Sequence, residues 1–281
     1  MLEKNKVSVV ITTYKRNSSL LRAIDSVIKQ SYKNFEIIVV NDCADDKLIL
    51  LELLKDYDLK LIHSNSGDAN SARKIGFLNS TGEFICFLDD DDYWGVDKLL
   101  FQVDLLKNNP SVILVTSNGI EFHEEKDEKS VIITSSNKNL LFYGNFIGGF
   151  SFVCLRSSFI KPNFFWLGLE SGQDWFFWLK LYFSYPNMVF EHCKSYDVFY
   201  QKSVVNISND PVKKVNGFFK VYKYIYPNLK INHIKYFNFI KPSNYGFTKC
   251  SFLSFVSSGI LFKPFYSYIF YIIKLKILRL K

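Results

Sequence analysis

The first half of the chain alternates short apolar runs with segments of helical periodicity. The apolar runs cover residues 7–12, 35–40, 59–63, 84–88 and 112–116. The segments between them repeat apolar residues every three or four positions and cover 17–30, 46–57, 70–79 and 96–107. Strands that alternate with helices over short connections predict an α/β fold, with a parallel sheet and helices on both of its faces.

The alternation loosens after residue 117. Polar stretches at 123–130 and 134–139 are typical of surface loops, 150–155 predicts a strand, and 173–183 predicts a helix. At 281 residues the chain fits one large α/β domain or one domain with an extension.

Charge distinguishes the C-terminal region from the rest of the chain. Residues 205–281 contain 13 Lys and Arg against the single acid Asp210, whereas residues 1–204 contain 22 basic and 26 acidic residues. A basic surface suits nucleic acid, an acidic partner or an anionic membrane. Aromatic and aliphatic stretches such as 265–273 favour the membrane over nucleic acid, although they are shorter than the ~20 residues of a spanning helix. We expect 206–281 to be a basic, aromatic-rich helical extension at an anionic membrane surface, with packing on the body as the alternative.

Composition excludes several classes of protein. An apolar content of 48%, with 17% aromatic residues, excludes a disordered chain. The cysteines are an odd five with no CxxC pair, and no signal peptide precedes the first strand, so we expect a reduced, cytoplasmic environment. The four histidines are isolated in sequence, which gives no support to a zinc hydrolase.

Four consecutive aspartates, Asp89 to Asp92, follow the apolar run 84–88. Carboxylates at the end of a buried strand suit a hard divalent cation and a nucleotide diphosphate, because such cations take oxygen ligands and α/β sheets bind ligands at the carboxyl ends of their strands. The alternative is a solvated acidic loop that complements the dipole of the next helix.

Three other predicted strand ends carry polar residues. Thr12 to Tyr14 end the first strand, Asp42 ends the second, and Arg73 lies in the helix after the third. In a parallel sheet these ends meet at one edge, so we expect a base and ribose site beside the metal and diphosphate site.

At these positions the sequence resembles the family 2 glycosyltransferases of GT-A fold. The resemblance covers roughly residues 5–205 and rests on five motifs in the family's order. They are VSVVITTYKR (7–16), FEIIVVND (35–42), NSARKIG (70–76), TGEFICFLDDDDYW (81–94) and QDWFFWLKL (173–181).

The resemblance implies a Rossmann-like, mostly parallel central sheet with helices on both faces. It implies a catalytic domain over 1–205, in which 1–117 bind the nucleotide sugar and 118–205 form the acceptor half. The implied reaction is metal-dependent, inverting transfer of a sugar from a nucleotide sugar, expected to be UDP-linked. The implied acceptor is a hydroxyl of a growing surface glycan, either free or lipid-linked. Capsule or lipopolysaccharide synthesis at the inner face of the cell membrane, with Mn²⁺ or Mg²⁺ as cofactor, would fit this type.

The resemblance also assigns donor-site residues. Tyr14 is similar to the family's base-stacking aromatic, with an ordinary strand-end aromatic as the alternative. Asp42 resembles the carboxylate that accepts a hydrogen bond from the uracil ring, with a turn residue as the alternative. Thr12 and Arg16 belong to the same donor site. Arg73 resembles a residue near the base and diphosphate, although a helix-surface arginine is the alternative.

Asp89 and Asp91 occupy the acid positions of the family's DxD motif. Asp91 is the expected metal ligand, and Asp89 or Asp90 is expected to face the ribose. Asp174 resembles the family's catalytic base, with a helix N-cap as the alternative, and Gln173 stands where the family usually has Glu.

The acceptor side is expected to include Gly148, Gly149 and Trp175, although two adjacent glycines are also typical of a turn at a strand entry. Two other functions stay open: a catalytically weak or inactive membrane-associated scaffold in a polysaccharide assembly complex, and a sugar nucleotidyltransferase. Homo-oligomerisation is also left open.

Overall fold

The computed structural model describes residues 2–123, 128–142, 144–201 and 211–225. The strands are β1 (Glu3–Thr13), β2 (Phe35–Asn41), β3 (Lys60–His63), β4 (Gly82–Asp89), β5 (Tyr93–Trp94), β6 (Val112–His123), β7 (Glu128–Ile132), β8 (Val153–Arg156) and β9 (Val189–Gln201). The α-helices are α1 (Asn17–Ile28), α2 (Lys47–Leu53), α3 (Ala69–Leu78), α4 (Lys98–Asn108), α5 (Gln173–Ser184) and α6 (Pro211–Ile225). Short 3₁₀ turns cover Lys138–Phe142, Phe150–Phe152, Ser157–Phe159 and Pro162–Phe164.

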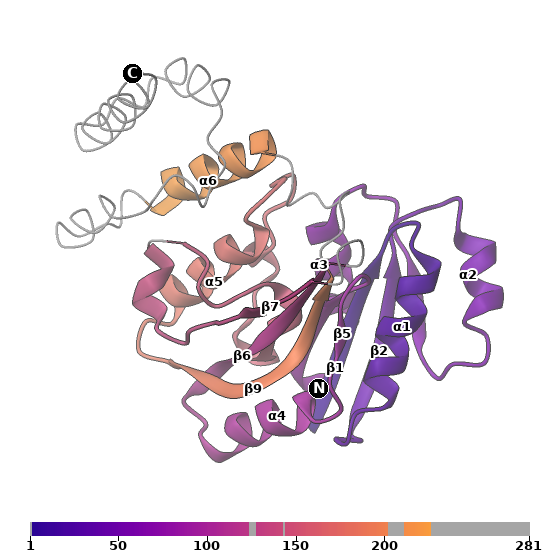
Figure 1. The fold of residues 1–281 in the computed structure, drawn as a ribbon, viewed down its shortest axis with the longest axis horizontal. Coiled ribbons are helices and arrows are strands. Elements are labelled where there is room, and N and C mark those ends of the chain that lie inside the picture. Colours follow the sequence, from indigo (N-terminus) through magenta and orange to yellow (C-terminus); the bar gives the residue numbers. More distant parts are fainter. Residues whose placement is uncertain (1, 124–127, 143, 202–210, 226–281) are drawn as a thin grey trace. The chain divides into compact units, whose positions relative to one another are not determined.

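One mixed sheet organises the domain, in the strand order β3-β2-β1-β4-β8-β6-β9-β5, with β7 paired to β6 (Figure 1). The first four strands are parallel, as the sequence predicts. β6 does not pair with β4 as a further parallel strand, because β8 lies between β4 and β6 and is antiparallel to both. The fold is therefore α/β with a parallel N-terminal half and a mixed C-terminal half.

The parallel strands form from the apolar runs because both of their faces are covered. Val7, Val9, Val10 and Ile11 of β1 are all fully buried. Strand order reverses between β3 and β4, so the right-handed crossover rule puts α3 on the face of the sheet opposite α1. Helices thus cover both faces of the parallel half.

α3 lies unusually close to β1. A Cβ added at Gly76 of α3 would lie 2.2 Å from Cγ1 of Val10, so only glycine fits at this contact. The close packing holds the start of α3 near the carboxyl end of β1, where the candidate site lies.

Two sequence predictions need correction. Residues 123–130, predicted as a surface loop, include the end of β6 and the start of β7, which pair in an antiparallel ladder. The predicted strand 150–155 begins later, at Val153, after a 3₁₀ turn. β9 was not predicted, because its few buried positions are irregularly spaced among half-buried and exposed residues.

The chain divides into two units, residues 1–169 with 173–204 and residues 170–172 with 205–281. In the second unit the structure describes α6, in which the rings of Phe218 and Tyr222 stack 6.1 Å apart. The rest of the predicted membrane-associated region, 206–210 and 226–281, lies outside the described residues. Among the helices that the structure describes, none is long and apolar enough to cross a membrane.

Candidate functional site

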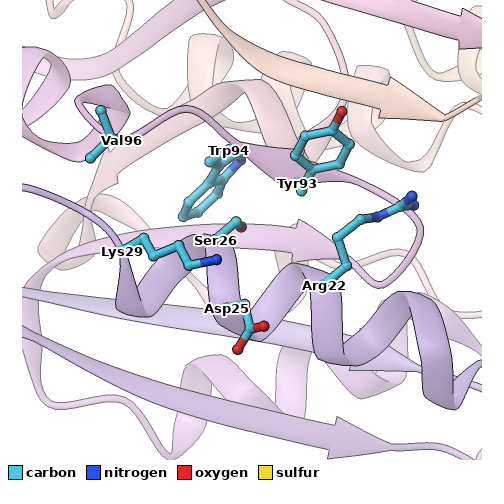
Figure 2. A pocket seen from close by; sticks show the side chains of 7 residues that line it. All are labelled: Arg22, Asp25, Ser26, Lys29, Tyr93, Trp94 and Val96. Carbon is cyan, nitrogen blue, oxygen red and sulfur yellow. The ribbon is translucent and has the colours of Figure 1, made fainter.

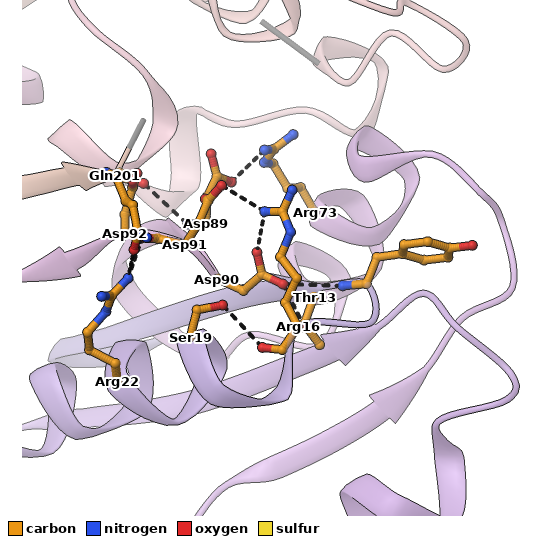
Figure 3. A network of polar contacts seen from close by, with 12 residues as sticks. Thr13, Arg16, Ser19, Arg22, Arg73, Asp89, Asp90, Asp91, Asp92 and Gln201 are labelled. Atoms are coloured by element: carbon orange, nitrogen blue, oxygen red, sulfur yellow. Dashed lines mark hydrogen bonds and ion pairs between the residues drawn. The ribbon is translucent and has the colours of Figure 1, made fainter. Parts of the chain in front are cut away.

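Strand register brings the predicted site residues to one edge of the sheet. Thr12 of β1 pairs with Asp89 of β4 on one side and with Val40 of β2 on the other. Thr12, Tyr14, Asp42 and the four aspartates therefore share this edge, and Figure 3 shows the polar network that joins the aspartates to β1, α1 and α3. The convergence expected from a parallel sheet is present.

Asp90 joins the end of β4 to the turn after β1. Its Oδ2 accepts hydrogen bonds from Thr13 Oγ1 at 2.7 Å and from the Tyr14 backbone N–H at 3.3 Å, and its Oδ1 accepts one from Arg16 at 3.0 Å. Burial raises the pKa of Asp90 to about 6, although Arg16 opposes the shift. With 4% of its surface exposed, Asp90 is an internal structural carboxylate, so Asp89 is the better candidate to face a ribose.

Arg73 connects the acid cluster to the start of α5. Its Nη2 lies 2.6 Å from Asp89 Oδ1 and its Nη1 lies 2.9 Å from Gln173 Oε1. The guanidinium is 4.5 Å from the centre of the Phe150 ring, and its buried Nε has no hydrogen-bond partner. Arg73 is buried, which rules out the alternative of a helix-surface arginine.

Asp91 lies beside Asp89 and Arg16. Its side chain is 18% exposed, and its Oδ2 lies 2.7 Å from Arg16 Nη1. Burial and the neighbouring charge of Asp89 raise the pKa of Asp91, while Arg16 lowers it. The carboxylates of Asp89 and Asp91 repel each other, so binding of a cation beside them is electrostatically favourable.

Asp92 points into the protein and is 1% exposed. Its Oδ1 accepts a hydrogen bond of 3.3 Å from the Gln201 backbone N–H, and burial raises its pKa well above the ordinary value. Because Asp90 and Asp92 are both buried, the alternative of a solvated acidic loop is wrong for these two residues.

Two residues that no sequence pattern singled out hold the acidic loop: Arg22 of α1 and Gln201 of β9. Arg22 Nη2 donates to the Asp91 carbonyl oxygen at 3.0 Å and also contacts the Gln201 side chain. Arg22 further lines a pocket of about 420 Å³ between α1 and β5 (Figure 2). The lining residues are Arg22, Asp25, Ser26, Lys29, Tyr93, Trp94 and Val96.

The donor set fits a hard cation that completes its coordination with substrate. No group of three His, Cys, Asp or Glu side chains within the described residues could hold a metal ion by itself. Mg²⁺ typically binds one or two carboxylates together with substrate phosphates and water. Asp91 is a partly exposed carboxylate at the strand end, with 18% of its side chain exposed, and the charge of Asp89 lies beside it. Asp91 would hold Mn²⁺ or Mg²⁺ together with a diphosphate.

Tyr14 and Asp42 differ in their availability to a ligand. Tyr14 is 56% exposed, so its ring is open for stacking. Asp42 is buried and accepts hydrogen bonds from the backbone N–H groups of Ser66 and Asp68 at 2.7 Å and 2.9 Å, and from Ser66 Oγ at 2.9 Å. A carboxylate offers about four lone-pair positions. Asp42 thus shapes the loop before α3 and has little capacity left for a base.

Asp174 is the second residue of α5 and is half-buried. Its Oδ1 accepts a hydrogen bond of 2.7 Å from the Trp175 N–H, and its Oδ2 accepts one of 2.8 Å from Asn145 Nδ2. Burial raises the pKa of Asp174 to about 6, against the opposing effects of the Trp175 N–H and the Arg73 charge. Asp174 lies within the helix and is not its N-cap.

The two glycines lie next to Asp174. Gly148 has a φ of +99° and accepts hydrogen bonds of 3.0 Å from both Asn145 Nδ2 and Trp178 Nε1. A Cβ added at Gly149 would lie 3.8 Å from Asp174 Oδ2.

Trp175 is different from the two glycines, because it is 4% exposed and donates its indole N–H to the Leu141 carbonyl at 2.6 Å. Its buried position does not agree with the predicted acceptor contact.

The chain matches the description "Glycosyl transferase family 2" over residues 8–162. A glycosyltransferase of Rickettsia conorii is 29% identical over 191 residues, which are 64% of this chain and 31% of that protein. The amylovoran biosynthesis glycosyltransferase AmsB of Erwinia amylovora is 35% identical over 106 residues, 36% of this chain and 35% of that one. This chain therefore spans about a third of the length of both relatives.

Solved structures show the same fold. The S. aureus TarS 1–349 complex with UDP-GlcNAc has a TM-score of 0.64 at 19% identity and covers 83% of this chain and 70% of that one. The mannosyltransferase PcManGT from Pyrobaculum calidifontis, in complex with GDP-Man and Mn²⁺, has a TM-score of 0.60 at 12% identity and covers 93% and 82%. The fold is GT-A-like, and because the family match covers more than half of its residues, the chain belongs to glycosyl transferase family 2.

Proposed function

We propose that the protein is a metal-dependent, inverting glycosyltransferase that moves a sugar from a nucleotide sugar to an acceptor hydroxyl. The observation that carries this proposal is the bridge made by Arg73. Its guanidinium binds Asp89 in the DxD segment at 2.6 Å and Gln173, the neighbour of Asp174, at 2.9 Å. A carboxylate pair suited to a cation and a candidate base are thus held in one cluster.

The proposed donor is UDP-linked, with Tyr14 stacking on the base. The family resemblance supports this choice, and the exposure of the Tyr14 ring is compatible with it. Among the similar structures, TarS is in complex with UDP-GlcNAc and PcManGT with GDP-Man, so the fold accepts both kinds of nucleotide. The hydrogen bonds already made by Asp42 favour a role for it in shaping the base-binding loop.

Asp174 is the proposed base that removes the proton from the acceptor hydroxyl. With a pKa of about 6, it is ionised at neutral pH and more basic than an ordinary aspartate. The N–H groups of Asn145 and Trp175 orient its carboxylate. A bound divalent cation would neutralise charge on the departing diphosphate. A single base opposite the leaving group implies inversion at the sugar.

The proposed acceptor is a growing bacterial surface glycan, either free or carried on a lipid. The name of AmsB places that relative in amylovoran biosynthesis, and the basic, aromatic composition of residues 206–281 suits an anionic inner membrane face. Truncation after Asp210 should abolish sedimentation with acidic liposomes and leave nucleotide binding intact. Failure of the full-length chain to bind such liposomes would contradict the membrane role.

Of the two other functions, the sugar nucleotidyltransferase is not supported, because the chain belongs to a glycosyltransferase family. An inactive scaffold differs from an enzyme by its lack of turnover. The half-buried carboxylate of Asp174, with its pKa raised to about 6, suits a general base near neutral pH and favours the enzyme.

A panel of nucleotide sugars tests the proposed donor class. The protein would be titrated with UDP-, GDP- and other nucleotide-linked sugars by calorimetry, with Mn²⁺ or with EDTA. Binding of one donor class that requires Mn²⁺ and is lost in Asp91→Asn supports the proposal. Asp104→Asn, at an exposed position on α4, is the matched control and should bind as wild type does. Metal-independent binding in all variants would contradict the proposal.

A further inference from the structure

Arg16 holds the carboxylate that the proposed function assigns to the metal ion. A single nitrogen, Nη1, lies 3.0 Å from Asp90 Oδ1 and 2.7 Å from Asp91 Oδ2 (Figure 3). The Arg16 side chain is 40% exposed, whereas the side chain of Asp90 is 6% exposed. One end of this ion-pair network can therefore move into solvent, while the other is fixed in the protein.

A divalent cation and the Arg16 guanidinium cannot both occupy this position. Mg²⁺ binds carboxylate oxygens at about 2.0–2.1 Å, so it would lie against the same carboxylate that Arg16 contacts. Two positive groups at such short separation repel strongly in a partly buried site. Asp90 gives Arg16 a second anchor at the strand end, so a cation alone must compete with an arginine that is already in place.

A diphosphate removes this conflict. Guanidinium groups bind phosphate oxygens through paired hydrogen bonds, and a flexible arginine at the mouth of the site can turn from a carboxylate to a phosphate. If Arg16 left, Asp91 would lie next to the charge of Asp89 and would have no counter-charge of its own. This arrangement favours binding of the cation. Nucleotide and cation would then each promote the binding of the other.

We propose that Arg16 is a built-in counter-cation. In the free protein the Arg16 guanidinium neutralises Asp91. When the divalent cation binds, the guanidinium moves to the donor diphosphate, so that metal binding is coupled to nucleotide binding. The inference rests on the proposed function, because it takes Asp91 as a cation ligand and a diphosphate as the incoming anion. By linkage, the factor by which nucleotide tightens Mn²⁺ binding equals the factor by which Mn²⁺ tightens nucleotide binding.

Calorimetric titration of Mn²⁺ into the protein without nucleotide tests the first half of the proposal. Arg16→Met should bind Mn²⁺ about tenfold more tightly than wild type, within the usual 5–150-fold range of coupling between sites. Arg16→Gln should change the affinity in the same direction. Lys15→Met is the matched control, because Lys15 is the adjacent exposed cation and pairs with Asp45 at 3.4 Å. Its Mn²⁺ affinity should stay close to that of wild type.

Titration of UDP with and without Mn²⁺ tests the second half. In wild type Mn²⁺ should tighten UDP binding, and in Arg16→Met this coupling should fall about tenfold while UDP alone binds more weakly. Equal affinity of wild type and Arg16→Met for Mn²⁺ alone would overturn the proposal, and so would coupling unchanged in the variant. If wild type bound no nucleotide under any condition, the proposed function would fail, yet the Mn²⁺ titrations would still decide whether Arg16 competes with a cation.

Discussion

Replacement of Asp174 by Asn should lower activity and raise stability, because a half-buried carboxylate that acts as a base is costly to ionise in the folded protein. Burial raises the pKa of Asp174 from the ordinary 3.8 to about 6. The folded protein therefore binds the Asp174 proton more tightly than the unfolded chain does. Stability is lost as the pH rises from about 4 to about 6, and the cost persists at every higher pH.

The size of the effect follows from the shift in pKa. At about 1.4 kcal/mol per pKa unit, ionised Asp174 lowers the free energy of unfolding by up to about 3 kcal/mol at neutral pH. Asn carries no charge and avoids this cost, although one of the hydrogen bonds from Asn145 or Trp175 becomes unfavourable, at about 1 kcal/mol. We expect Asp174→Asn to be about 1–2 kcal/mol more stable than wild type at pH 7.5 and no more stable at pH 4.

Urea unfolding at several pH values measures the stability change, and steady-state turnover measures the loss of the base. Turnover of wild type should fall about tenfold from its plateau when the pH is lowered to 5, because Asp174 becomes protonated. Turnover of Asp174→Asn should be at least roughly 10²-fold lower than that of wild type, with donor affinity preserved. Asp104→Asn should change neither property. An Asp174→Asn variant that is less stable than wild type at pH 7.5, or one that keeps full turnover, would contradict the role of Asp174 as the base.

Three further substitutions separate binding, stability and proton transfer. Tyr14→Ala should leave the melting temperature unchanged, because the ring is 56% exposed, and should weaken donor binding by about 1–3 kcal/mol in calorimetry. Arg73→Met should lower the free energy of unfolding by about 2 kcal/mol in urea, because Asp89 loses its buried partner. Asn145→Ala should move the acid limb of the pH–rate profile to higher pH, because the ionised Asp174 loses a hydrogen-bond donor. Unchanged donor affinity would contradict the prediction for Tyr14→Ala, and unchanged stability would contradict the one for Arg73→Met. An unchanged pH–rate profile would contradict the prediction for Asn145→Ala.

The parallel half of the fold was predictable because β1, β2 and β4 are largely buried and read as continuous apolar runs. β1, β2, β3 and β4 all lie within one or two residues of their predicted bounds, except that β1 starts at Glu3. β9 escaped prediction, because a long strand with one partly exposed face mixes polar and apolar residues. The place of β8 between β4 and β6 was also unpredictable, since the order of strands depends on long-range packing.

The site was predictable at its strand ends but not in its contacts. Sequence order and a parallel sheet suffice to bring Asp42 and Asp89 to one edge. The buried bridge from Arg73 to Gln173 and the hydrogen bond from Asn145 join residues 100 and 29 positions apart, so no local pattern encodes them. Four adjacent carboxylates likewise look equivalent in sequence, and only burial shows that Asp92 points inward.

Hydrolysis of the nucleotide sugar by the purified protein tests whether turnover requires a cation held at the strand-end carboxylates. Release of nucleoside diphosphate would be followed for wild type, Asp91→Asn and Asp104→Asn, each with Mn²⁺ and with EDTA, after circular dichroism has shown that all three are folded. We expect release by wild type and Asp104→Asn only when Mn²⁺ is present, and no release by Asp91→Asn. Release that persists in EDTA, or an equal rate in Asp91→Asn, would contradict a cation held by the strand-end carboxylates.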